Sequence, residues 1–486
     1  MSSTFFGLEM MKRALFAQQT ALNTVGQNIS NANTPGYSRQ VVNMVASQPM
    51  YYPSMTSGGL VGQIGTGVDV QSITRMRESF LDTQYRNQNQ LLGEWEVKSD
   101  TVNKLQAILN EPSDTGLTSA LNQFFNAWQT LSTDPNNPSA RSVVLQRGKQ
   151  LADLLNETAQ QLNDLNNDLQ TNIQTQVTQV NSYIDQIQKL NVQIKSAETF
   201  GANANDLRDQ RDYLVDQLSK IADVKVTENN QSYTLQVGDK TVLVDDGSTT
   251  WKHVVYDSGT FYTVDHAITN PQSSDYDTPS LNIQSGELKG LVDSQNIYVD
   301  TYINQLNDFT NTLVTQINTQ HKQGYTLSSS QPTNVDFFTA NPSNPAASIQ
   351  VAITDTSLIA AASPNSIYTN DSGTLSGDGN NALSIGNMYN QSVTFATSSA
   401  GTFEDFLRSM VGQLGVQGQE ADQMEKNQNS LVNQMDTMRQ SVSGVSLDEE
   451  MANMIKYQQA YGAAARMVTT IDSLLNTIVT GMGITR

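Results

Sequence analysis

The chain of 486 residues has no cysteine and little charge for its length. Without cysteine it can form neither disulfides nor thiolate metal sites. Charged residues make up 15% of the chain, against about 25% in an average soluble domain. Asparagine, glutamine, serine and threonine take their place, most densely over residues 156–191. Burying neutral polar surface against a copy of itself costs less than burying charged surface, which slightly favours a polymer subunit.

Basic charge is scarce as well, because 27 lysines and arginines stand against 47 acidic residues, for a net charge of −20. A field of this sign repels phosphate, so we expect no nucleic-acid partner. The chain has no basic amphipathic helix and no apolar run of the roughly 20 residues that a membrane span needs, so we expect no membrane partner. The N-terminal residues do not form a secretory signal. Taken alone, they predict a cytoplasmic protein unless another export route applies.

Patterns for catalysis and metal binding are also missing. The three histidines, His253, His266 and His321, do not form an HExxH spacing or another ligand pattern. The glycines around Gly65 lack the Lys-Ser/Thr of a phosphate-binding loop, and a turn before a strand explains them better. We therefore expect a protein that is not an enzyme, with no catalytic residue, metal site or cofactor.

Apolar residues recur at every seventh position near both ends of the chain. This a/d pattern predicts helices that need a partner helix along their length. Because both ends carry it, we expect them to pair as a coiled coil or to be buried together in an assembly. The predicted assembly-interface residues are Leu8, Met11, Leu15, Leu22, Val25 and Ile29 in the first series, and Leu447, Met454, Tyr461, Val468, Ile471, Leu475, Ile478 and Met482 in the second.

Local signals mark where these two helices end and begin. Pro35 presets φ and Gly36 accepts a positive φ, so they fit the central positions of a type II turn after the first helix. The start of the last helix carries a capping box, in which Ser446 accepts from the Glu449 amide and Glu449 reaches back. The predicted turn motif consists of Asn33, Pro35, Gly36 and Tyr37.

The hydrophobic period is near 3.6 over most of the chain and changes to 2 at Val224. The predicted class is therefore α+β, mainly α, with paired terminal helices, a body of long helices and small β-rich domains inserted in the middle. Helices are expected at 4–31, 75–110, 117–131, 139–200 (with a break or bend), 204–222, 286–323, 402–440 and 446–482. The expected domains are a terminal helical domain (1–35 and 446–486), a helical body (36–222, 286–324 and 401–445), a β insertion (223–285) and, at 325–400, a second β insertion or a flexible segment.

Two long stretches resemble the rod, hook and hook-associated proteins of the bacterial flagellum. They are ALNTVGQNISNANTPGY at 21–37 and SLDEEMANMIKYQQAY at 446–461. Further stretches at 37–40, 64–85 and 205–212 resemble the hook-associated members that form the hook–filament junction. The resemblance covers the ends and the helical body, and it is weak over 325–400.

This resemblance implies a secreted structural protein of the extracellular flagellum, exported through the flagellar type III apparatus, which replaces the cytoplasmic prediction. In such proteins the two terminal helices pair as an inner tube around a central channel, and the other domains stack outward. The implied role is to join hook to filament, and hence to serve motility. The implied partners are identical subunits in a ring, the hook protein, the second hook–filament junction protein and an export chaperone at the C-terminal segment.

An amphipathic helix with an uncovered stripe is marginal in water, since packing supplies most helical stability. Our hypothesis is that 1–35 and 446–486 are largely disordered before assembly and fold on docking. Two other interpretations stay open at this point. The heptads could form an ordinary intramolecular coiled coil in a soluble monomer, and the β insertions could serve a surface-exposed adhesin or host-interaction protein.

Overall fold

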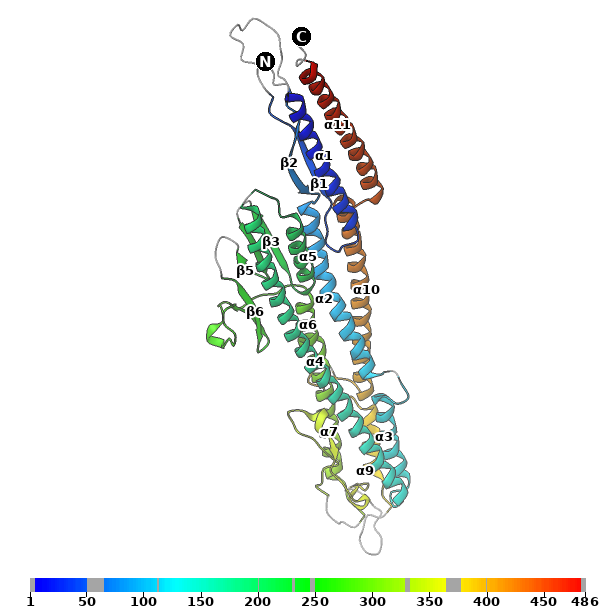
Figure 1. Cartoon of the computed structure of the whole chain (residues 1–486). Helices are drawn as coiled ribbons and strands as arrows, with labels where there is room; N and C mark the ends of the chain where they lie inside the picture. Colours follow the sequence, from blue (N-terminus) through cyan, green and yellow to red (C-terminus); the bar gives the residue numbers. More distant parts are fainter. Residues whose placement is uncertain are drawn as a thin grey trace. The chain divides into compact units, whose positions relative to one another are not determined.

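Helices make up most of the fold, as the predominance of the 3.6 period predicts (Figure 1). The computed structural model describes residues 5–49, 65–111, 113–199, 201–229, 232–244, 250–327, 333–363, 377–398 and 400–481. The helices are α1 (Phe6–Ser30), α2 (Ser79–Leu109), α3 (Leu117–Thr133), α4 (Pro138–Glu198), α5 (Asn205–Ile221), α6 (Glu287–Asp293), α7 (Asp300–Gln323), α8 (Pro345–Ser348), α9 (Asn380–Asn387), α10 (Phe403–Ser443) and α11 (Leu447–Gly481).

The longest helix, α4, is continuous over 61 residues, so a break between 139 and 200 is absent. At a rise of 1.5 Å per residue its length is about 90 Å. Pro138 occupies its first turn, where no backbone N–H is needed. In contrast, the helix expected at 286–323 is interrupted, because a π-helical segment, Ser294–Val299, separates α6 from α7.

The strands form small antiparallel sheets. They are β1 (Gln40–Ala46), β2 (Val68–Arg75), β3 (Val224–Asn229), β4 (Ser232–Val237), β5 (Lys240–Val244), β6 (Lys252–Asp257), β7 (Thr260–Asp265), β8 (Phe338–Thr339) and β9 (Gln350–Val351). β1 pairs with β2 across a bulge at Asn43/Met44. β3, β4 and β5 form a three-stranded meander, and β6 and β7 form a hairpin beside it in sequence. Strands β3 to β7 all lie within 223–285, where the sequence predicts a β insertion.

Contacts group the chain into two compact units. The first unit contains Met1–Leu91, Gln179–Gln284 and Asn429–Arg486, and the second contains Leu92–Thr178 and Ser285–Gln428. The first unit therefore holds the terminal helices α1 and α11 together with α5 and the strands β1 to β7. Its core includes Val215 and Leu218 of α5 and Leu235 and Val237 of β4, all fully buried.

The second unit is built around an aromatic cluster. Phe124 and Trp128 of α3 pack edge-on at 6.3 Å between ring centroids, and Phe337 lies 5.3 Å from Trp128. The buried His321 of α7 adjoins the same rings. Within 325–400 the described residues contain β8, β9, α8 and α9. The domain division expected from the sequence, including the nature of this segment, stays a prediction.

Candidate assembly interface

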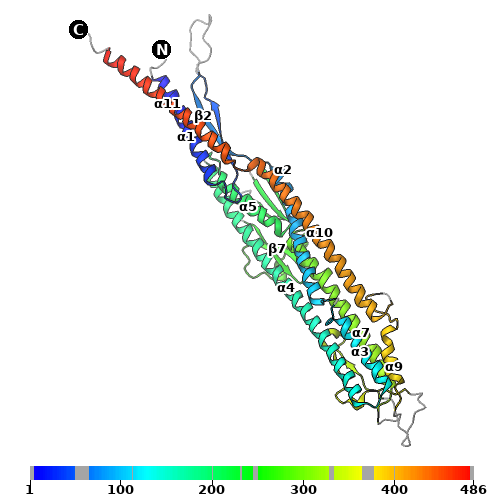
Figure 2. The ribbon, with the colours of Figure 1, turned by 90° about the vertical axis from the view of Figure 1, so that its right-hand side faces the viewer.

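The two terminal helices lie side by side and run in opposite directions (Figures 1 and 2). Two contacts define their register. At one end, a Cβ on Gly7 would lie 3.3 Å from the Ile471 side chain. At the other, the Asn28 amide donates to the Glu450 carboxylate at 3.0 Å. The first and last helices therefore pack against each other, as the heptads near both ends predict.

Both terminal helices bury small residues. Ala17, Ala21 and Ala464 are buried, with Ala21 fully so. Among the predicted interface residues only Val25 is buried. Half-buried are Leu8, Met11, Leu15, Leu22, Ile29, Met454, Val468, Ile471 and Leu475.

The remaining predicted interface residues are not covered by the chain's own helices. Leu447 and Ile478 are each 48% exposed, and Tyr461 is 38% exposed. Met482 lies outside the described residues. A pair of helices covers only one side of each member, so further apolar residues face solvent. These outer apolar residues, which the a/d pattern did not predict, are Phe16, Met451, Ile455, Met467, Leu474 and Val479, each half or more exposed.

The predicted turn is present after α1. The Tyr37 amide donates to the Thr34 carbonyl at 3.2 Å, and Gly36 has a φ of 79°, as the third position of a type II turn requires. Gly36 also lies against α5, where a Cβ would stand only 2.7 Å from Tyr213. Asn33 and Pro35 are exposed, and Tyr37 is half-buried. A cavity of about 540 Å³, lined by Pro35, Tyr37 and Tyr213 among others, opens on one side of the turn.

A set of polar residues joins the turn to both terminal helices, and we call it the polar clip: Asn28, Tyr37, Arg39, Gln40 and Glu450. The Asn28 side chain donates to the Gln40 carbonyl and accepts from the Gln40 amide, at 2.9 and 3.0 Å. The Tyr37 hydroxyl donates to Asn28 at 2.8 Å. Glu450, 1% exposed, accepts from Asn28 and lies 2.8 Å from Arg39. Every polar atom of the buried Asn28 amide group therefore has a partner, as burial requires.

The capping box of α11 is only partly formed. The Glu449 amide donates to the Ser446 hydroxyl at 3.5 Å. The Glu449 carboxylate lies 2.9 Å from Arg39, so this carboxylate extends the polar clip. The negative charges of the first turn of α11 also complement the positive end of its helix dipole.

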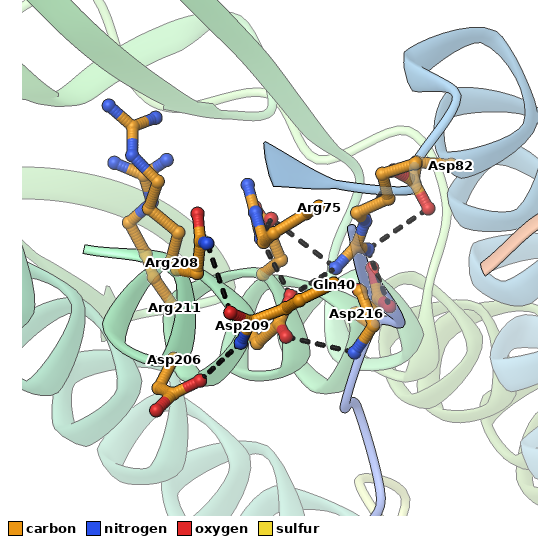
Figure 3. A network of polar contacts seen from close by, with 12 residues as sticks. Gln40, Arg75, Asp82, Asp206, Arg208, Asp209, Arg211 and Asp216 are labelled. Carbon is orange, nitrogen blue, oxygen red and sulfur yellow. Dashed lines mark hydrogen bonds and ion pairs between the residues drawn. The ribbon is translucent and has the colours of Figure 1, made fainter. Parts of the chain in front are cut away.

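Helix α5 connects the polar clip to a buried ionic network (Figure 3). Asp209, Asp212 and Asp216 follow one face of α5, and each is less than 9% exposed. Arg75 lies 2.8 Å from Asp209 and 2.9 Å from Asp212. Asp216 receives Arg86 at 2.6 Å and is also bonded by Arg439. Two segments far apart in sequence, residues 75–86 and α10, therefore meet at α5.

The same helix holds the residues that follow the turn. Asp209 accepts the Ser38 amide at 2.8 Å. Asp206 accepts the Gln40 side chain at 2.7 Å and the Gln27 side chain at 2.8 Å. These contacts attach the polar clip to α5. The stretch 205–212 was noticed in the sequence only for its resemblance, and no periodic signal predicted which residues it would meet.

The electrostatics follow from burial and from these partners. Burial alone would raise the pKa of Asp212, but Arg77, Arg75 and Arg86 outweigh it and hold that pKa below its usual range. For Asp209 burial prevails, and its pKa is raised despite Arg75. Burial and the nearby carboxylates raise the pKa of Tyr37, so its hydroxyl remains a donor to Asn28 at neutral pH.

Among the described residues, no group of three or more histidine, cysteine or acidic side chains is placed to hold a metal ion. No helix in the described part of the chain is long and apolar enough to cross a membrane. His253 and His266 lie on or beside the β6–β7 hairpin, and His321 is buried in the second unit.

Family models match three stretches of the chain. Residues 8–37 match the flagella basal body rod protein family, and residues 439–480 match the C-terminal region of the flagellar basal body rod FlgEFG proteins. Residues 102–338 match the helical domain of the flagellar hook-associated protein FlgK. The first two matches coincide with the terminal helices and the polar clip. Together with the fold, they define a structural protein of the flagellum.

Relatives match along the whole length. Flagellar hook-associated protein 1 of Bacillus subtilis is 36% identical over 100% of this chain and 99% of its own. The protein of the same name from Salmonella typhimurium is 26% identical over 96% of this chain and 98% of its own. This chain belongs to the flagellar hook-associated protein 1 family. A solved structure, the flagellar hook junction protein FlgK from Burkholderia pseudomallei, shares the fold, with a TM-score of 0.62 at 16% identity, covering 75% of this chain and 100% of that one.

Membership places the chain among structural flagellar proteins, which are not an enzyme family. It also implies an extracellular component that assembles with other parts of the flagellum.

Proposed function

We propose that this protein joins the flagellar hook to the filament. The name of the Burkholderia structure, a hook junction protein, supports this role, as does the match of the chain ends to rod-protein families. In this proposal identical subunits form a ring, with the hook protein on one side and the second junction protein on the other. The protein is exported through the type III apparatus, and a chaperone holds its C-terminal segment before export.

The observation that carries the proposal is the exposure of large apolar residues along the terminal helices. α11 alone exposes Met451, Ile455, Met467 and Leu474, each at 50% or more. Exposed apolar residues gathered on paired helices are typical of a surface that another molecule covers. In a ring, neighbouring helix pairs would cover these outer apolar residues, and the coverage would stabilise helices that are marginal alone. Folding of the termini would thus be coupled to assembly.

The proposal assigns each predicted domain a position in the assembly. The terminal helical domain, 1–35 and 446–486, would form the inner tube, and the helical body would surround it. The β insertion, 223–285, would face outward. Its two ends meet, because the Gln284 amide donates to the Asp223 carboxylate at 3.2 Å, so the helical body can continue past the insertion.

A charge introduced at one of the outer apolar residues tests the proposal. Ile455→Asp should abolish incorporation at hook ends, because a carboxylate cannot be buried between apolar helices without a partner. The monomer should stay folded, since Ile455 is 60% exposed in the single chain. The matched control is Val416→Asp, at a residue of α10 that is 67% exposed. Purified variants would be added to hooks from a strain lacking the protein, and filament growth would be scored by electron microscopy. Normal filament growth with Ile455→Asp would refute the proposal that neighbouring subunits cover the outer apolar residues.

A further inference from the structure

We propose that the polar clip divides the terminal helix pair into a proximal half, which is ordered in the free protein, and a distal half, which orders only on assembly. The proximal half comprises residues 17–30 of α1 and 447–461 of α11. The distal half comprises residues 6–16 and 464–481. This inference rests on the proposed function, since it specifies which part of the termini undergoes coupled folding.

The burial of α1 changes along its length. Its buried residues are Ala17, Ala21, Thr24, Val25 and Asn28, and all of them lie in the proximal half. None of residues 6–16 is buried, and Phe16 is 60% exposed. Since most helical stability comes from packing, the proximal half is held far better by its own chain.

The polar clip anchors only the proximal end. The Asn28 side chain makes four hydrogen bonds, to Gln40, Tyr37 and Glu450. The Arg39 amide donates to the Ser443 carbonyl at 2.9 Å, which fixes the connection between α10 and α11. Asp206 and Asp209 then hold the same segment on α5. None of these contacts requires a second copy of the chain.

The distal half has weaker support. Arg13 is 41% exposed and lies 3.4 Å from Asp69 and 3.9 Å from Glu9, and ion pairs at such exposed positions contribute little. Gly67 packs on Met10, where a Cβ would stand 3.2 Å from the methionine side chain. In the distal half of α11, Ala464 is buried and Ile471 lies beside Gly7 of α1, so the order of this half depends on that of the distal half of α1.

The division has a physical consequence for assembly. Forming the first turn of a helix is the unfavourable step, whereas adding residues to an existing helix is not. With the polar clip in place, the last turns of α1 and the first turns of α11 are already helical. Docking then has only to extend both helices toward the chain ends. Each incoming subunit already contains the first turns of both helices, so no new helix has to be nucleated.

Amide hydrogen exchange on the full-length monomer tests this, read by mass spectrometry at neutral pH. We expect slow exchange over 17–30 and 447–461, and exchange close to that of an unstructured peptide over 464–481. In Asn28→Ala, exchange of the proximal half should accelerate about tenfold or more, because the buried partners of the amide lose their bonds. The matched control is Asn23→Ala, at an exposed position of the same helix. Both changes raise helix propensity equally, so only loss of the polar clip separates them.

The outcomes distinguish this inference from the proposal on which it rests. Slow exchange over both halves would overturn coupled folding itself. Fast exchange over both halves would leave coupled folding standing and overturn the division. Equal exchange in Asn28→Ala and Asn23→Ala would show that the polar clip does not hold the proximal half. Exchange of α3, in the second unit, reports in each case whether the rest of the variant is folded.

Discussion

At the scale of the residue, His321 is the clearest case of a titratable group used for structure. It is fully buried. Its Nε2 accepts the Ala360 amide at 3.0 Å, so its Nδ1 carries the hydrogen and donates to the Val335 carbonyl at 2.8 Å. Burial lowers its pKa to about 4, although Asp336 and the Val335 carbonyl favour the charged form. The neutral ring therefore links two chain segments that follow α7.

This pKa predicts how stability changes with pH. The unfolded chain binds a proton at His321 near pH 6.5, whereas the folded chain binds it only near 4. The stability contributed by the neutral ring is thus complete above pH 6.5 and is lost as the pH falls toward 4, by about 3 kcal/mol in total. His321→Gln should flatten this part of the profile and lower stability at pH 7. Urea unfolding at several pH values would measure it, with His266→Gln as the control. An unchanged slope in His321→Gln would contradict the assignment.

At the scale of the element, α5 shows how one helix organises the first unit. Its acidic face meets arginines from the ends of β2 and α10 and from α2, while Arg211 packs over the Tyr233 ring at 3.9 Å. Ion pairs this deeply buried need all their partners, because removing one leaves an uncompensated charge.

We therefore predict that Asp212→Asn destabilises the first unit by about 3 kcal/mol. Its depressed pKa means that the carboxylate contributes stability above the unfolded pKa of about 3.9, which is lost as the pH falls below it. The matched control is Asp206→Asn, the same change at an exposed position of α5, which should cost less than about 1 kcal/mol. Denaturant unfolding monitored by exchange of α5 amides would compare them. Equal losses would show that burial of the network adds nothing.

Elements differ in how far the sequence predicted them. The heptads predicted α1 and α11, and Pro35 and Gly36 predicted the turn, because these signals are local. β7 departs from strict alternation, because its adjacent residues Thr263 and Val264 are both buried. The outer apolar residues, such as Met451 and Ile455, were not predicted. The a/d pattern selects apolar residues on one face of a helix, whereas these residues lie outside that face.

At the scale of the whole molecule, the β insertion can be separated from the structural role. It leaves and rejoins the helical part at hydrogen-bonded residues, Asp223 and Gln284. It also stabilises α5, since Glu228 lies 2.7 Å from both Arg208 and Arg211. An adhesive role of the protein would depend on this insertion.

We predict that replacing residues 224–283 by two glycines preserves hook–filament joining and motility while lowering the stability of α5. The stability falls because Val215 and Leu218 lose the core residues Leu235 and Val237, and because Arg208 and Arg211 lose Glu228. Motility and filament attachment would be measured in a strain carrying only the shortened protein. Glu228→Gln, in the intact chain, controls for the lost ion pairs alone. Loss of motility with α5 still protected from exchange would mean that the insertion takes part in the junction. Loss of surface attachment with normal motility would support the adhesive alternative.

The sequence by itself determined the mainly helical class, the two apolar ends and the turn between α1 and β1. Hydrophobic period and turn chemistry depend on neighbouring residues, so they can be read along the chain. Only the tertiary structure decided that α1 and α11 run antiparallel in one register, that Asn28 meets Glu450, and that α5 gathers arginines from two distant segments, residues 75–86 and α10. Polar pairing has no period, because a buried amide or carboxylate is satisfied by whichever partner the completed fold brings within hydrogen-bonding distance.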